Sequence, residues 1–210
     1  QDGRSASLTA PNGQAQQGVL GASLLDAQVE ASEVGVLEAH GTGTAWGDPI
    51  EAGSLVAAVL SAREEALAVG GVKANIGHAE PAAGMTGLLK LVVGLRWGAA
   101  APNAQLRVLN AHVGGALRGA ECVLVAQLGR LLSGGQVGGV SSFGYSGTIA
   151  HAVLAFVVRG NEGGCEPISL RWPHRFPAQK RALLNMCETA FSLLAYHRRS
   201  FPWREMVYSA

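Results

Sequence analysis

The sequence predicts a layered α/β fold. Two consecutive segments, residues 34–63 and 66–98, each run from a short apolar strand through a glycine-containing loop into a helix. Two further apolar segments, at 137–144 and 148–158, flank the glycine turn GYSG, a pattern typical of a β-hairpin. The chain has 210 residues, of which 48% are hydrophobic and 15% charged, so it can form one ordinary domain with a buried core.

The first β–α unit follows a polar, turn-rich opening that indicates a surface loop. Apolar residues at near-helical spacing predict a helix over 14–31, and the segment VGVLEA at 34–39 predicts a buried strand. After a glycine loop, Asp48 is predicted to cap the next helix, with Pro49 at its first position and Glu51 three residues after Asp48. This helix is expected to run to about residue 63.

The second unit consists of a strand at 66–73, a loop at 74–81 and a helix at 82–98. Strands are also predicted at 121–127, 137–144 and 148–158. The composition changes after about residue 160, where prolines, glycines and scattered charges indicate a linker packed on a domain surface, with one amphipathic helix at 178–197.

Composition and charge exclude several classes of function. The net charge is +1, so nothing favours a nucleic-acid or membrane-surface partner. Lys90 and Arg96 interrupt the longest apolar run, which predicts a buried helix and no membrane span. The three cysteines have no metal-binding spacing, so no metal site is expected, and their odd number favours reduced thiols in the cytoplasm. The chain starts without methionine and has no signal peptide, which indicates a fragment or a processed piece.

The loop GTGTAWG, residues 41–47, lies between a strand and a helix, as a dinucleotide-binding loop would. Its spacing is G-x-G-x-x-x-G, and Asp48 places a carboxylate where a pyrophosphate would have to bind. A neutral ligand with amides and a thioester therefore fits better. Thr42 and Thr44 are candidates to hydrogen-bond such a ligand, and plain turn capping by these hydroxyls is the alternative.

Two histidines occupy equivalent loops. His40 and His78 each follow a predicted strand and precede a helix, in consecutive β–α units. Ligands bind at the carboxyl ends of strands in α/β folds, so the two rings are predicted to converge at one sheet edge. A structural role is as good an explanation for either histidine alone, but the pair favours function.

Three motifs resemble the C-terminal signatures of β-ketoacyl synthases and occur in the same order as in that family. They are EAHGTGT (38–44), KANIGHAEPAAG (73–84) and SSFGYSGTIAH (141–151). The resemblance covers about residues 1–158. It implies the C-terminal half of a ketosynthase domain from polyketide or fatty-acid synthesis, with a thiolase-like fold that is one part of a layered αβαβα architecture. Residues 159–210 resemble the linker that follows such a domain.

The resemblance implies a decarboxylative Claisen condensation of acyl and malonyl thioesters carried on the phosphopantetheine of acyl carrier protein. His40 and His78, both neutral, would donate N–H groups to the enolate oxygen. Lys73 matches the family's lysine and, if buried, needs a partner, for which Asp48 is the first candidate and Glu80 the second.

Other matching positions would contact the substrate. Thr42 and Thr44 would hold the amides of the phosphopantetheine arm. Phe143 would gate the acyl pocket and complete an oxyanion hole with its backbone N–H, and Gly144 beside it would allow the tight turn. His151 is predicted to be structural.

The sequence departs from the family pattern in two places. Ile149 stands where the motif usually has asparagine, which puts the loop near Phe143 in doubt. Cys122, Cys165 and Cys187 do not lie in the family's nucleophile motif, so the nucleophile is expected in an N-terminal half that this chain lacks.

The expected parent is therefore a homodimeric acyltransferase in the cytoplasm, or alternatively in a plastid, with acyl carrier protein as partner and no directly bound cofactor. The isolated piece is expected to expose an apolar face and to be inactive in condensation. A non-catalytic scaffold of the chain-length-factor type is the second hypothesis, and a nucleotide-binding α/β enzyme is the third.

Overall fold

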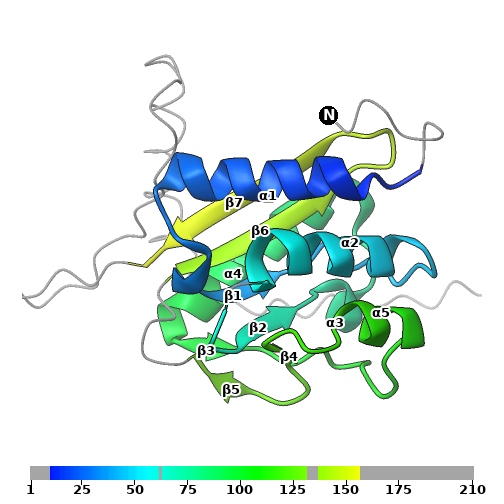
Figure 1. Ribbon diagram of the computed structural model, residues 1–210. Coiled ribbons are helices and arrows are strands. Elements are labelled where there is room, and N and C mark those ends of the chain that lie inside the picture. The colour runs from blue at the N-terminus through cyan, green and yellow to red at the C-terminus, as the bar shows by residue number, and fades with distance from the viewer. Residues whose placement is uncertain (1–9, 62, 132–136, 157–210) are drawn as a thin grey trace, which may run out of the picture. The chain divides into compact units, whose positions relative to one another are not determined.

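The computed structural model describes residues 10–61, 63–131 and 137–156 (Figure 1). All of them belong to one compact unit, Gln1–Pro173. A second unit, His174–Ala210, lies outside the described residues, and so do the linker and helix predicted beyond residue 158.

The main sheet has five strands in the order β4-β2-β1-β6-β7. β1 runs parallel to both of its neighbours, β2 and β6, and β4 runs parallel to β2, whereas β7 pairs antiparallel with β6. The predicted α/β fold with a final hairpin is therefore confirmed. The strands are β1 (Val34–Glu38), β2 (Leu67–Gly70), β4 (Cys122–Leu124), β6 (Val137–Phe143) and β7 (Ile149–Ala155).

Helices cover both faces of this sheet. α1 (Gly13–Ala27) and α2 (Gly47–Leu55) lie on one face, and α4 (Ala83–Trp97) lies on the other (Figure 1). Adjacent residues of β1 point into different cores: Leu37 packs in the cluster under α1 and α2, and Val36 in the cluster against α4. This alternation is the period-two pattern of a strand that is buried on both faces.

The outer face of α4 is also apolar. Side chains spaced four residues apart along it are large, apolar and exposed: Met85, Leu89, Val93 and Trp97. A helix with apolar side chains on its outer face as well as on its core face is typically covered by further protein. The exposed apolar face expected of this piece is thus present on α4.

The start of α2 differs from the prediction. Asp48 lies inside the first turn and does not cap the helix. Instead, the hydroxyl of Thr44 accepts the N–H of Gly47 at 3.0 Å. A wider π-helical turn, Val56–Leu60, continues α2, so the helix stops three residues before the predicted end.

Lys73 does not end a strand, as predicted, but begins the short helix α3 (Lys73–Ile76). β2 stops at Gly70 because the carboxylate of Glu38 accepts the N–H of Val72 and turns the chain into α3.

Several short elements carry no clear pattern in the sequence and were not predicted. They are the two-stranded sheet of β3 (Ala99–Ala100) and β5 (Gly129–Arg130), the helix α5 (Ala111–Ala116), and two 3₁₀ turns, Ala31–Glu33 and Glu80–Ala82.

Candidate active site

The two histidine loops meet at the carboxyl edge of the sheet. β1 and β2 are parallel neighbours in which Glu38 pairs with Gly70, and β6 ends at the same edge with Phe143. The ring centroids of His40 and His78 lie 6.0 Å apart, with the rings nearly perpendicular. Phe143 places its ring 5.5 Å from that of His40. The predicted convergence of the two imidazoles is therefore confirmed, and Phe143 joins them.

His40 is held by its backbone. The backbone N–H of His40 donates to Oε1 of Glu51 at 2.7 Å, and the N–H of Gly41 donates to Oε2 of Glu51 at 2.9 Å. The ammonium of Lys73 donates to the backbone carbonyl of His40. Burial lowers the pKa of the His40 ring to about 4, and the charge of Lys73 and the proximity of His78 act in the same direction. His40 is consequently neutral at pH 7.

The partners at the Nδ1 atoms assign the tautomer of each ring. Nδ1 of His40 lies 3.4 Å from Nζ of Lys73, which as an ammonium can only donate. Nδ1 of His78 accepts the backbone N–H of Glu80 at 2.8 Å. Both Nδ1 atoms are thus acceptors, so the ring proton of each neutral imidazole is assigned to Nε2.

Glu51 is a site residue that the sequence analysis missed, because it was considered only as part of a helix cap. It lies in α2, where its carboxylate reaches back to the His40 loop. Burial raises the pKa of Glu51 to about 7, against the effect of the two backbone N–H groups that it accepts. Its position eleven residues after His40, one turn into the next helix, is the only signal in the sequence.

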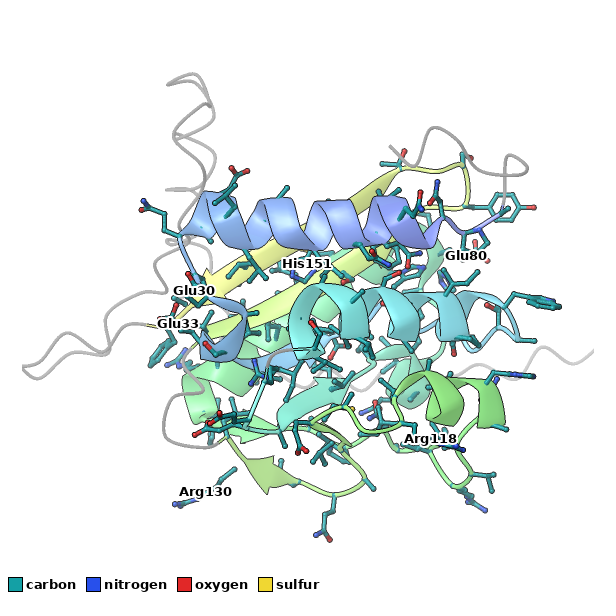
Figure 2. All side chains as sticks on the ribbon, viewed as in Figure 1. Glu30, Glu33, Glu80, Arg118, Arg130 and His151 are labelled. Carbon is teal, nitrogen blue, oxygen red and sulfur yellow. The ribbon has the colours of Figure 1, made fainter. Side chains whose placement is uncertain are left out.

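Lys73 contacts His40 and forms no ion pair within the described residues, so the predicted pairing with Asp48 or Glu80 is wrong. Burial lowers the pKa of Lys73, and the nearby carboxylates, that of Glu51 most strongly, oppose this shift. Glu80, which is labelled in Figure 2, is exposed. It supports His78 through its backbone N–H.

The loop from Thr42 to Asp48 is tied by its own hydrogen bonds. Asp48 accepts the N–H of Gly43 with both carboxylate oxygens at 3.1 Å, and the hydroxyl of Thr42 lies 3.4 Å from Oδ1 of Asp48. The hydroxyl of Thr44 caps α2. The structure thus contains the turn-capping alternative for both threonines. A phosphate at this loop would meet the carboxylate of Asp48.

The turn between β6 and β7 closes without the missing asparagine. Gly144 donates its N–H to the carbonyl of Thr148 at 2.6 Å, and Gly147, with φ of 83°, donates to the carbonyl of Gly144 at 3.1 Å. Ile149 pairs with Phe143 across the hairpin. Because Gly144 donates to Thr148, the residue just before β7, continuing the alternation of the ladder turns the N–H of Phe143 away from that strand. Gly144 supports the turn, and its own N–H is already used.

His151 lies beneath α1, in β7 (Figure 2). Nδ1 of its ring is 3.0 Å from the hydroxyl of Ser141, and its carbonyl accepts the hydroxyl of Ser23 at 3.1 Å. Burial lowers the pKa of His151 to about 4. The prediction that it is structural agrees with this placement.

Cys122 lies in β4, away from the histidine edge, and burial raises the pKa of its thiol, with a smaller contribution from Glu121. Cys165 and Cys187 lie outside the described residues. In the part of the chain that the structure describes, no group of three or more His, Cys, Asp or Glu side chains could hold a metal ion. None of the described helices has the length and hydropathy needed to cross a membrane.

Comparison with known proteins agrees with this geometry. Residues 1–107 match the family model described as "Beta-ketoacyl synthase, C-terminal domain". The chain is 42% identical over 156 residues to polyketide synthase GfsA of Streptomyces halstedii and 41% identical over 160 residues to mycoketide-CoA synthase of Mycobacterium tuberculosis. These matches cover 73% and 75% of this chain but 2% and 4% of the relatives, so the chain spans a small part of each.

Solved ketosynthases share the fold. The oxazolomycin ketosynthase domain OzmH KS7 of Streptomyces albus superposes with a TM-score of 0.70 at 32% identity, over 78% of this chain and 30% of that one. The ketosynthase from module 6 of the bacillaene synthase of Bacillus subtilis gives a TM-score of 0.65 at 30% identity, over 73% of this chain and 28% of that one. The chain therefore belongs to the β-ketoacyl synthases, as the C-terminal domain of a polyketide synthase ketosynthase with part of the thiolase-like fold.

Proposed function

We propose that the chain supplies the two imidazole donors for a decarboxylative Claisen condensation on acyl carrier protein. The observation that carries this proposal is the pair of Nε2–H groups assigned to His40 and His78, on rings whose centroids are 6.0 Å apart. Two such donors can address a single oxygen atom that becomes negatively charged.

The difficult species is the enolate of the malonyl thioester. The bond between the α-carbon and the carboxylate carbon breaks, carbon dioxide leaves, and the electron pair remains on the α-carbon and the thioester oxygen. Each preorganised donor to that oxygen contributes roughly 3–4 kcal/mol to lowering the barrier. The enolate carbon then attacks the carbonyl of an acyl-cysteine, and the cysteine thiolate leaves.

Other residues of the edge assist in this scheme. Lys73 keeps the proton of His40 on Nε2 through its contact with Nδ1. Phe143 gates the acyl pocket with its ring and offers its backbone N–H, which is turned away from β7, to the oxyanion of the acyl-cysteine. The hydroxyl of Thr42 donates to Asp48, so Thr42 and Thr44 retain acceptor capacity, with which they hold the amide N–H groups of the phosphopantetheine arm.

The parent protein supplies the rest. The nucleophilic cysteine comes from a part of the ketosynthase that this chain does not contain. In support, Cys122 lies in a strand away from the histidine edge, and burial raises the pKa of its thiol, which disfavours the nucleophilic thiolate. The parent is a cytoplasmic or plastid homodimer that receives its substrates from acyl carrier protein, and the chain alone is inactive in condensation. The exposed apolar face of α4 supports this last point.

The test is decarboxylation of malonyl-carrier protein by the complete ketosynthase. We expect the His40→Ala and His78→Ala variants each to lower kcat by about 100- to 1,000-fold. His112→Ala is the matched control, because His112 is exposed and lies in α5. Normal decarboxylation by both site variants would refute the assigned role and favour the scaffold hypothesis.

A further inference from the structure

A buried ion pair lies directly behind the histidine loops. Glu38, the last residue of β1, is 3% exposed. Its Oε2 accepts Nζ of Lys90, from α4, at 2.6 Å. Its Oε1 accepts the backbone N–H of Val72. One carboxylate thus joins three elements: the end of β1, the middle of α4 and the start of α3.

A glycine lies directly against this pair. Gly70 pairs in register with Glu38 on the adjacent strand. A Cβ on Gly70 would lie 2.7 Å from Nζ of Lys90, so the ammonium would have to shift, and 3.1 Å from Oε2 of Glu38, which is a tight contact. A carboxylate and an ammonium are therefore accommodated at this point of the sheet edge.

The partners of Glu38 lie next to the site residues. Glu38 precedes His40 by two residues, and Val72 immediately precedes Lys73, which contacts His40. None of the four residues of α3 is buried, so packing of its own side chains in a core does not fix it. Its position depends on hydrogen bonds, both those at the turn that leads into it and those of the Asn75 amide with Pro102 and Ala104, and the same helix leads on to His78.

We infer that Glu38 is a positioning residue that joins the two histidine loops by holding the N–H of Val72, with Lys90 compensating its buried charge. The inference rests on the proposed function, because that function is the reason why the two histidine loops must be held together. The two tasks of Glu38 are separable: Lys90 needs its charge, whereas Val72 needs only an acceptor oxygen.

Two double variants of the complete ketosynthase separate these tasks. Glu38→Gln with Lys90→Met removes both charges and keeps an amide oxygen for Val72. Glu38→Leu with Lys90→Met removes both charges and the acceptor. We expect the first to decarboxylate malonyl-carrier protein at close to the wild-type rate, and the second to lose about 10- to 100-fold in kcat with KM little changed.

A second pair of variants tests the same bond from its donor side. Val72 has φ of −57°, which proline tolerates, so Val72→Pro removes the N–H without changing either charged residue. Val72→Ala shortens the side chain and keeps the N–H. We expect kcat to fall about 10- to 100-fold in Val72→Pro and to stay near wild type in Val72→Ala. Thermal unfolding checks that each variant is folded, and if a leucine variant does not fold, this proline and alanine pair decides.

Equal kcat values within both matched pairs would overturn the inference. Crystal structures of the same variants give a readout that needs no turnover: His40 and His78 separate in Glu38→Leu/Lys90→Met and stay together in Glu38→Gln/Lys90→Met. If the wild-type enzyme fails to decarboxylate malonyl-carrier protein, the proposed function falls, and the ring separation alone still supports or overturns the positioning role.

Discussion

Acid should destabilise this domain through His151. The ring lies against the backbone of Gly139, where a Cβ would be 2.7 Å from Nε2, and Nδ1 lies beside the hydroxyl of Ser141. Burial alone accounts for the lowering of its pKa from 6.5 to about 4. Among the residues that the structure describes, no carboxylate contributes to the pKa of this ring, so none compensates an imidazolium there.

The sign and size of the effect follow from linkage. Above pH 6.5 the ring is neutral in the folded and unfolded states, and its contribution to stability is complete. As the pH falls from 6.5 towards 4, only the unfolded state takes up the proton, so the free energy of unfolding decreases. A difference of 2.5 pKa units (6.5 minus 4) at 1.36 kcal/mol each corresponds to about 3 kcal/mol.

Urea unfolding of the complete ketosynthase at a series of pH values measures this effect, with His151→Asn as the comparison. Asparagine can keep a polar contact with Ser141 and cannot be protonated in this range. The pH-dependent contributions of His40 and Glu51 to the free energy of unfolding are common to both proteins and cancel in the difference between them. We expect the wild type to lose about 3 kcal/mol more than the variant between pH 7 and pH 4. Parallel stability curves for the two proteins would refute the reasoning.

Three further predictions concern single residues. Glu51→Gln places an amide N–H₂ against a backbone donor of the His40 loop, so kcat for decarboxylation should fall about 10- to 100-fold with KM retained, and an unchanged kcat would contradict the anchoring role. Gly138→Ala places a Cβ 2.6 Å from Cδ1 of Leu91, so the free energy of unfolding measured in urea should fall by about 1–3 kcal/mol. Gly18 lies on α1, and a Cβ there would meet no atom within 4 Å, so Gly18→Ala should raise the free energy of unfolding by about 0.5–1 kcal/mol. Thr44→Ala removes the cap of α2 and should cost about 1 kcal/mol in stability; a raised KM for carrier-bound substrates in the same variant would indicate that the hydroxyl also binds the pantetheine arm.

The meeting of His40 and His78 could be predicted because the topology determines it. Parallel neighbouring strands end at one edge, so a loop after each strand brings its residues to the same place. The apolar run of α4 predicted a buried helix, and the structure differs on one face, where Met85, Val93 and Trp97 are exposed.

The partner of Lys73 could not be predicted in this way. It depends on a four-residue helix whose entry turn is hydrogen-bonded to a buried carboxylate from another strand, and no local pattern in the sequence reports such a contact. The cap of α2 was mispredicted because Asp48 satisfies the local rule for a cap, while the folded loop lets Thr44 take that place and turns Asp48 towards Gly43. Tertiary contacts decided both cases.

The two imidazoles are both engaged at Nδ1, His40 by an ammonium and His78 by a backbone amide. Neither ring can therefore pass a proton from one nitrogen to the other while these contacts last. The two rings are arranged as fixed hydrogen-bond donors and are unsuited to act as a proton relay. In the proposed condensation, the two rings would therefore stabilise the enolate oxygen without taking part in proton transfer.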